Sequence, residues 1–214
     1  MLKRTPLYDA HVKLGGRIVE FGGWEMPVQY SSIVDEHLAV RRAAGVFDIS
    51  HMGEVSIEGS GAADFLNFVL TNDVKKLARG QGQYSIMCNE RGGTIDDLYV
   101  YRLGEQQYLL IINASRIDVD VDWLQQKASG RNSLKLENVS DAMGAIAVQG
   151  PRAPAIVPGC FPGTDKLVKN QVATLDYEGK MIYVARTGYT GEDGFEIVAP
   201  AEIIKNIWTR ALAA

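Results

Sequence analysis

Strand and helix patterns alternate over residues 54–138 in an order that one compact unit can satisfy. The elements are, in chain order, a strand at 54–57, a helix at 62–70, strands near 82–88, 94–102 and 107–113, a helix from 116 to about 127 capped by Ser115, and a strand around 134–136. This run of about 85 residues has the size and order of an antiparallel sheet with helices on one face. We therefore predict a separate α+β unit at residues 54–138.

Shorter patterns flank this unit on both sides. They are a helix at 6–14, a strand at 17–21, a helix from the Ser32 cap to Gly45, a strand at 46–49, and later strands at 145–148 and 181–185. Because the strands before and after the unit are of one kind, we expect them to share a second sheet. The predicted fold class is α+β, with two mixed α/β-sheet domains with antiparallel sheets. The first domain is discontinuous, at 1–53 plus 139–214, and the second is inserted into it at 54–138.

Composition excludes several classes of protein. Of the 214 residues, 46% are hydrophobic and 22% are charged, which suits a globular chain better than a membrane bundle or a disordered tail. The formal charge of −4 comes without a basic run, so we expect no nucleic-acid partner. No window approaches the roughly 20 apolar residues of a membrane span, and the N-terminus has no signal-peptide core, so we expect no membrane partner. With only Cys88 and Cys160, a disulfide framework is excluded and a reducing, cytoplasmic location is expected.

The last predicted helix spans residues 200–212. Its apolar residues follow a helical spacing, but neither a capping glycine nor an asparagine comes before Ala214. This pattern indicates that the chain is a fragment of a longer polypeptide.

Common ligand-binding signatures do not match this sequence. The glycines at 188, 191 and 194 are three apart, which fits neither the dinucleotide fingerprint nor the phosphate loop. No histidine has a second ligand at metal spacing, so we expect ordinary roles and no metal site for His11, His37 and His51.

Three alternate aspartates, Asp118, Asp120 and Asp122, imitate the start of a calcium loop. Trp123 stands where the turn glycine of such a loop belongs, which argues against calcium. We therefore interpret the three acids as the solvated face of the helix that contains them.

The segment Gly92–Tyr101 is a glycine turn that continues into a strand. Neighbouring strand residues point to opposite faces, so Asp96 and Asp97 cannot act as one carboxylate pair on the same substrate. Asp97 shares its face with Tyr99 and Tyr101, which suits a lined pocket, whereas Asp96 shares a face with apolar residues. A solvated turn acid is the alternative interpretation.

The segment Arg186–Glu196 carries three glycines between two strands. Such a loop lets the backbone approach a ligand closely, and the carboxylate of Glu196 can accept two parallel hydrogen bonds from an amidine-like edge. The alternative is an ordinary hairpin loop with turn glycines.

Taken together, these segments resemble the folate-dependent aminomethyltransferase family, to which the T-protein of the glycine cleavage system belongs. The resemblance runs in order through nearly the whole chain, which makes it far more specific than any single motif. Its segments are Thr5–Tyr8, Phe21–Pro27, Val46–Gly53, Leu70–Val74, Tyr84–Ser85, Gly92–Tyr101, Asn113–Ala114, Val148–Pro151 and Arg186–Glu196.

The resemblance implies a fold of three domains around a folate cavity, of which this chain would supply the first and the inserted second, with the third domain absent. It implies an aminomethyltransferase that takes an aminomethyl group from the lipoyl arm of the lipoylated H-protein. Loss of ammonia and attack by a nitrogen of tetrahydrofolate would give methylenetetrahydrofolate and the dihydrolipoyl arm. Tetrahydrofolate is thus the implied co-substrate, no metal is implied, and the fragment itself is expected to bind folate poorly or not at all.

The resemblance also implies roles for individual residues. Asp97 matches the critical aspartate, which positions the folate and helps to stabilise an iminium-like cation, and Glu196 would bind the pterin edge. The other residues implied to line the pocket are Met52, Tyr84, Tyr101, Asn113 and Tyr189.

Two other activities occur in relatives with this fold, so an alternative stays open. These relatives are a folate-binding protein that assists iron–sulfur cluster maintenance and folate-dependent demethylases. The intact segments Gly92–Tyr101 and Arg186–Glu196 favour the aminomethyltransferase, although a shared fold does not determine the chemistry.

Overall fold

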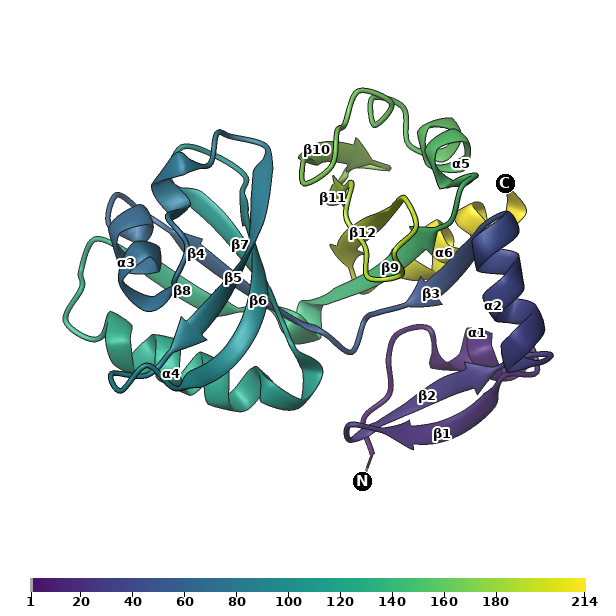
Figure 1. The fold of residues 1–214 in the computed structure, drawn as a ribbon, viewed down its shortest axis with the longest axis horizontal. Coiled ribbons are helices and arrows are strands. Elements are labelled where there is room, and N and C mark those ends of the chain that lie inside the picture. Colours follow the sequence, from purple (N-terminus) through teal and green to yellow (C-terminus); the bar gives the residue numbers. More distant parts are fainter. Residues whose placement is uncertain (1) are drawn as a thin grey trace. The chain divides into compact units, whose positions relative to one another are not determined.

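A computed structural model describes residues 2–214, which divide into two compact units (Figure 1). The first unit takes in the chain up to His51 together with Ala142–Ala214, and the second unit is Met52–Asp141. We predicted the borders at 53/54 and 138/139, whereas the structure places them at 51/52 and 141/142. Over the described residues, no helix is long and apolar enough to span a membrane.

The second unit contains an antiparallel five-stranded sheet in the order β5-β6-β7-β4-β8. Its strands are β4 (Gly53–Glu58), β5 (Gln81–Cys88), β6 (Thr94–Arg102), β7 (Gln107–Ile112) and β8 (Lys135–Asn138). The short helices η1 (Val74–Lys76), η2 (Ala114–Arg116) and η3 (Ser140–Ala142) lie in its connections or at its end. The sequence predicted the order of these strands along the chain, whereas their order in the sheet comes from the structure.

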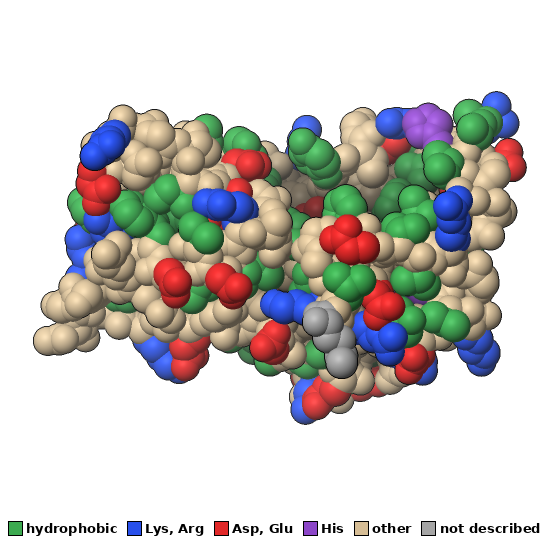
Figure 2. Space-filling model, turned by 90° about the horizontal axis from the view of Figure 1, so that it is seen from below, with side chains coloured by type: hydrophobic (Ala, Val, Ile, Leu, Met, Phe, Trp, Pro, Cys, Tyr) green, Lys and Arg blue, Asp and Glu red, His purple; other side chains and the backbone are tan. Residues whose placement is uncertain are grey.

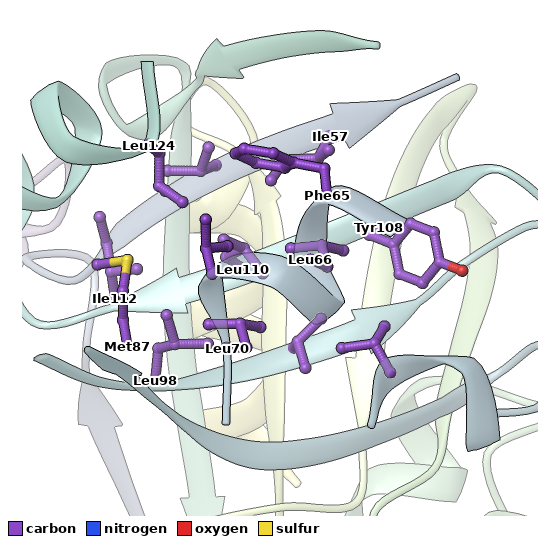
Figure 3. Close-up of a cluster of buried hydrophobic side chains, with 14 of the residues drawn as sticks. Ile57, Phe65, Leu66, Leu70, Met87, Leu98, Tyr108, Leu110, Ile112 and Leu124 are labelled. Atoms are coloured by element: carbon purple, nitrogen blue, oxygen red, sulfur yellow. The ribbon is translucent and has the colours of Figure 1, made fainter. Parts of the chain in front are cut away.

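Two helices, α3 (Ala62–Val69) and α4 (Ile117–Ala128), cover one face of this sheet (Figures 1 and 3). Phe65 and Leu66 of α3 and Leu124 of α4 are fully buried against inward-facing residues such as Ile57 and Leu110. Each such side chain contributes about 1.5–3 kcal/mol when it leaves water. The prediction of helices on one face of an antiparallel sheet is therefore confirmed.

The start of α4 differs from the prediction. Ser115 does not cap it, because the residues before α4 form η2, with Asn113 at its N-terminal flank. Asn113 thereby stands at the end of β7, where its side chain faces the neighbouring strand.

The first unit contains the five-stranded sheet β10-β11-β12-β9-β3, which is antiparallel throughout. Its strands are β3 (Gly45–Asp48), β9 (Met143–Gln149), β10 (Val172–Tyr177), β11 (Lys180–Ala185) and β12 (Gly194–Pro200). The helices α5 (Ala153–Cys160) and α6 (Ile204–Ala213) pack on one face, where Val157, Ile207 and Trp208 join the core. Strands from before and after the second unit thus share a sheet, as expected for 46–49, 145–148 and 181–185.

The expectation that the strand at 17–21 belongs to this sheet is wrong. This strand, β1 (Arg17–Phe21), pairs only with β2 (Trp24–Gln29) in a separate two-stranded sheet. Gly22 and Gly23, with φ of 58° and 88°, form the two-residue turn between them, a conformation that favours a tight local hairpin. The helices α1 (Tyr8–Lys13) and α2 (Ile33–Arg42) flank the hairpin in sequence, and Ser32 caps α2 by accepting a hydrogen bond from the Asp35 amide at 3.0 Å.

A buried carboxylate joins the N-terminal segment to β3. Asp48 accepts hydrogen bonds from Thr5 Oγ1 at 2.6 Å, His11 Nε2 at 2.8 Å and the Ser50 amide at 2.9 Å. Burial disfavours the charged form, but these hydrogen bonds outweigh it and hold the pKa of Asp48 below its ordinary value. The Tyr30 hydroxyl lies 2.8 Å from His11 Nδ1, so His11 connects two polar groups inside the unit. Its role is structural, as expected for a histidine without a metal partner.

Candidate functional site

Asp97 and Asp96 lie on opposite faces of β6. Asp96 is 7% exposed and points toward the helices, whereas Asp97 is exposed on the other face. A β-bulge precedes them, since Met87 pairs with Asp96 and Cys88 pairs with Thr94, so that Ile95 is the extra residue. From Asp96 onward the alternation is regular, so Asp97 lies on the face that the helices leave uncovered.

Three tyrosines share this face of the sheet with Asp97. Tyr84 on β5 pairs directly with Tyr99 on β6, and the rings of Tyr99 and Tyr101 have centroids 4.8 Å apart. Tyr101 is 2% exposed and stands opposite Gly82, where a Cβ would come within 2.5 Å of its ring. Glycine at 82 therefore makes room for the Tyr101 ring, and Tyr84 remains exposed beside it.

Asn113 ties both aspartates to the end of β7. Its Nδ2 donates to Asp96 Oδ1 at 3.0 Å and to the Asp97 carbonyl at 2.9 Å, and its backbone N–H donates to Asp96 Oδ2 at 3.2 Å. Both neighbours of Nδ2 are acceptors, which settles the orientation of the amide. The side-chain oxygen is then the atom that Asn113 can offer to a ligand.

Glu54 extends the same face on the far side of β7. It pairs with Ile111, which in turn pairs with Tyr99. Glu54 is 1% exposed, and its burial raises the pKa of its carboxyl to about 8. Nothing in the sequence singles out Glu54, because a glutamate at the start of a strand has no local sign of burial.

Glu196 occupies the open face of the sheet in the first unit. Its neighbours Phe195 and Ile197 point to the helix-covered face, and its cross-strand partners are Ala147 on β9 and Ala185 on β11. Small residues on both sides leave space above the Glu196 carboxylate. Thr187 Oγ1 donates to Glu196 Oε2 at 2.6 Å and so orients it.

The glycine-rich loop that precedes β12 folds around Gln149. This side chain is 1% exposed, donates to the Thr187 carbonyl at 3.1 Å, and accepts from Thr190 Oγ1 at 3.0 Å. A Cβ at Gly188 or Gly194 would lie 1.9 Å or 2.4 Å from the amide of Gln149. These two glycines are thus required by close packing against Gln149, a group of the chain itself, whereas Gly191, with φ of 80°, is a turn glycine.

Ion pairs hold the ends of this loop. Arg186 binds Asp193 through two contacts, Nε to Oδ1 at 3.2 Å and Nη2 to Oδ2 at 2.6 Å, and Arg41 Nη1 binds Glu192 at 2.9 Å. The Arg186 guanidinium keeps the pKa of Asp193 below its ordinary value. Between these anchors Tyr189 is fully exposed, so its side chain is available to a ligand rather than part of the core.

Each unit has a cavity among its described residues. The first unit has a cavity of about 710 Å³ with Met26, Tyr30, Phe47, Tyr189 and Trp208 among its lining residues. In the second unit, loops around Gly59, Gln106 and Ser133 line a groove of about 800 Å³ that includes none of the predicted site residues. Tyr189 is a predicted site residue that lines the cavity of the first unit.

The remaining predicted residue is Met52. It is partly buried and is the first residue of the second unit. It lies where the chain passes from the first unit into the second.

The interpretation of the three helix aspartates is wrong for Asp120. Asp118 and Asp122 are exposed on α4, but Asp120 is fully buried. Residues two apart on a helix differ by about 200° in direction, so the three acids cannot share one face. This spacing was the signal in the sequence that could have identified Asp120.

Acidic and basic side chains are mixed on one face of the molecule, as Figure 2 shows. In residues 2–214, no group of three or more His, Cys, Asp or Glu residues has the arrangement needed to hold a metal ion.

Comparison with known proteins identifies relatives of the chain. It is 46% identical over 216 residues to an aminomethyltransferase of Bacillus subtilis, covering 100% of this chain and 59% of that protein. The crystal structure of glycine cleavage system aminomethyltransferase T from Bartonella henselae superposes with a TM-score of 0.92 at 36% identity, over 99% of this chain and 57% of that one. The chain therefore spans just under three fifths of the length of these relatives.

A more distant structure shares the fold alone. It is the heterotetrameric sarcosine oxidase from Corynebacterium sp. U-96, with a TM-score of 0.67 and 14% identity over 100% of this chain and 94% of that one. The family model described as the GCVT N-terminal domain matches residues 7–214. The chain thus belongs to the GCVT N-terminal domain family.

Proposed function

We propose that the chain is part of an aminomethyltransferase of the glycine cleavage system. The enzyme would transfer the methylene carbon of the aminomethyl-dihydrolipoyl arm of the H-protein to tetrahydrofolate. Ammonia leaves, the carbon–sulfur bond breaks, and the products are methylenetetrahydrofolate and the dihydrolipoyl arm. Family membership over residues 7–214 and 46% identity to an aminomethyltransferase support this proposal. We also propose a cytoplasmic location.

The observation that carries the proposal is the setting of Asp97. Its exposed carboxylate shares one face of the sheet with Tyr84, Tyr99 and Tyr101, and Asn113 donates a hydrogen bond to its backbone carbonyl. A carboxylate in this position can hold the nucleophilic nitrogens of tetrahydrofolate and stabilise the cation that forms when ammonia leaves. The aromatic side chains offer the flat faces on which a pterin or an aminobenzoyl ring can pack.

The further site residues are proposed on the same resemblance. Glu196 would accept the two parallel N–H groups of the pterin edge, with Thr187 holding its second oxygen. Met52, Tyr84, Tyr101, Asn113 and Tyr189 would contact the folate. Of these residues, Tyr84 and Tyr189 are exposed, and Asn113 and Met52 are partly exposed.

Substitution of Asp97 tests the function. Tetrahydrofolate binding is measured first, and methylenetetrahydrofolate formation from aminomethylated H-protein second, on this chain and on a form extended past Ala214. Asp97→Asn should reduce turnover of the extended form by about 10² to 10⁴, whereas Asp122→Asn, an exposed acid of α4, should have no effect. Equal turnover of the wild type and Asp97→Asn would remove Asp97 from the mechanism. Folate binding without product formation would instead indicate a folate-binding relative with another activity.

A further inference from the structure

The second unit contains a fully buried acid that the proposed reaction does not use. Asp120 is 0% exposed on the inner side of α4, and neither of its carboxyl oxygens has a hydrogen-bond donor in the described residues. A buried carboxylate without donors is costly, so the structure must compensate in another way.

The group that faces Asp120 is another carboxyl, that of Asp96 on β6. Asp96 already accepts two hydrogen bonds, one on each oxygen, from the side chain and backbone of Asn113. Both oxygens of Asp96 therefore act as acceptors. A hydrogen bond between two carboxyl groups requires a proton on one of them, and Asp120 is the one whose oxygens accept nothing.

The charges around Asp120 agree with this arrangement. Burial contributes most to raising its pKa, to about 8, followed by Asp96, while Asp97 adds a smaller effect in the same direction. Arg116 of η2 is the cation that acts against them. Its Nε atom is itself buried without a hydrogen-bond partner, so Arg116 does not neutralise the pair through that atom.

We propose that Asp120 carries the proton of a carboxylic acid–carboxylate pair with Asp96, and that this pair positions Asn113 and, through it, Asp97. The protonated Asp120 donates to Asp96, and Asp96 aligns the Asn113 amide. The same amide nitrogen reaches the Asp97 carbonyl at 2.9 Å. Asp96 and Asp120 are thus positioning residues. Because they share one proton, the pair places one negative charge near Asp97 instead of two. The link to catalysis rests on the proposed function of Asp97.

The asparagine variant separates this role from simple packing. Asp120→Asn keeps the shape and supplies an N–H donor to Asp96, so it should preserve the geometry of Asn113. Asp120→Leu removes the donor and should displace it. Asp122→Asn, on the exposed side of the same helix, is the control for a lost acid.

The first test uses the chain without ligand. With ¹³C-labelled aspartate carboxyls, one resonance should titrate well above pH 6 in the wild type and in Asp122→Asn, and this titration should be missing in Asp120→Asn. Because the folded state retains a proton that the unfolded state loses, the melting temperature of the wild type should fall relative to Asp120→Asn as pH rises from 5 toward 8. The expected difference is about 3 °C for each pH unit crossed. Parallel melting profiles, or no aspartate titrating above pH 6, would overturn the proposal.

The second test connects the pair to the site. The side-chain amide signals of Asn113 should be unchanged in Asp120→Asn and shifted in Asp120→Leu. In the extended form, tetrahydrofolate affinity should likewise be retained in the asparagine variant and fall by about tenfold in the leucine variant. Equal tetrahydrofolate affinity in all variants would refute the positioning role. The carboxyl titration would then still show whether Asp120 and Asp96 share a proton. If the wild type itself does not bind folate, the proposed function fails and the titration result stands by itself.

Discussion

Replacement of Asp48 tests how the N-terminal segment is joined to the first unit. The carboxylate accepts three hydrogen bonds from Thr5, His11 and Ser50, and these donors come from different parts of the chain. Asp48→Asn keeps one oxygen and turns an N–H group toward the remaining donors. It should therefore lose one or two charge-assisted hydrogen bonds, each of about 1.5–3 kcal/mol.

A change of the His11 tautomer recovers part of this loss, because the Tyr30 hydroxyl can accept as well as donate. We expect the free energy of unfolding to fall by about 2–4 kcal/mol at pH 7, a large share of the roughly 5–15 kcal/mol typical of a domain. Urea unfolding followed by tryptophan fluorescence measures it, since the Trp208 ring lies 5.2 Å from the His11 ring in the same unit. Asp9→Asn, an exposed acid of α1, is the control.

The pH dependence gives a second, independent criterion. The pKa of Asp48 is lowered in the folded state, so its contribution to stability is present above the unfolded value near 3.8 and is lost as pH falls through the folded value. The difference between the wild type and Asp48→Asn should therefore shrink in strong acid. A loss below about 0.5 kcal/mol at pH 7, or a difference that does not change with pH, would refute the reasoning.

Three further changes test other parts of the structure. Glu196→Gln should weaken tetrahydrofolate binding by at least about tenfold, because the amide cannot accept both N–H groups of a pterin; H-protein docking is the control, and unaltered folate affinity would remove Glu196 from the site. Because the pKa of Glu54 is raised in the folded state, the wild type should lose about 1.4 kcal/mol of unfolding free energy per pH unit between about pH 4.5 and about 8. Glu54→Gln should not show this loss. Identical pH profiles in urea unfolding would contradict this. Gly150→Ala should lower the melting temperature, because its φ is 132° and a Cβ would lie 2.5 Å from the Ala43 carbonyl, whereas Gly159→Ala, which has open space, should change it little.

Local patterns accounted for most elements of the second unit. Alternation along β5, β6 and β7 and the apolar stripe of α3 are properties of consecutive residues, so they can be read without knowing the partners. The alternation along β6 also predicted that Asp96 and Asp97 point to opposite faces of the sheet. β2, α5 and β10 were not predicted, because Pro27 and Pro158 interrupt the first two patterns and β10 has no clean alternation.

The sequence by itself determined most of the elements, the family and the face of Asp97, because each depends on residue order. Only the tertiary structure decided which distant groups meet. It placed β1 with β2 in a sheet of their own instead of in the sheet that contains β11, buried Asp120 against Asp96, and placed Gln149 inside the glycine-rich loop. The physical reason is that burial and hydrogen bonding depend on the partner brought from elsewhere in the chain. An aspartate on a helix has the same local sequence signal whether its carboxyl faces water or another acid.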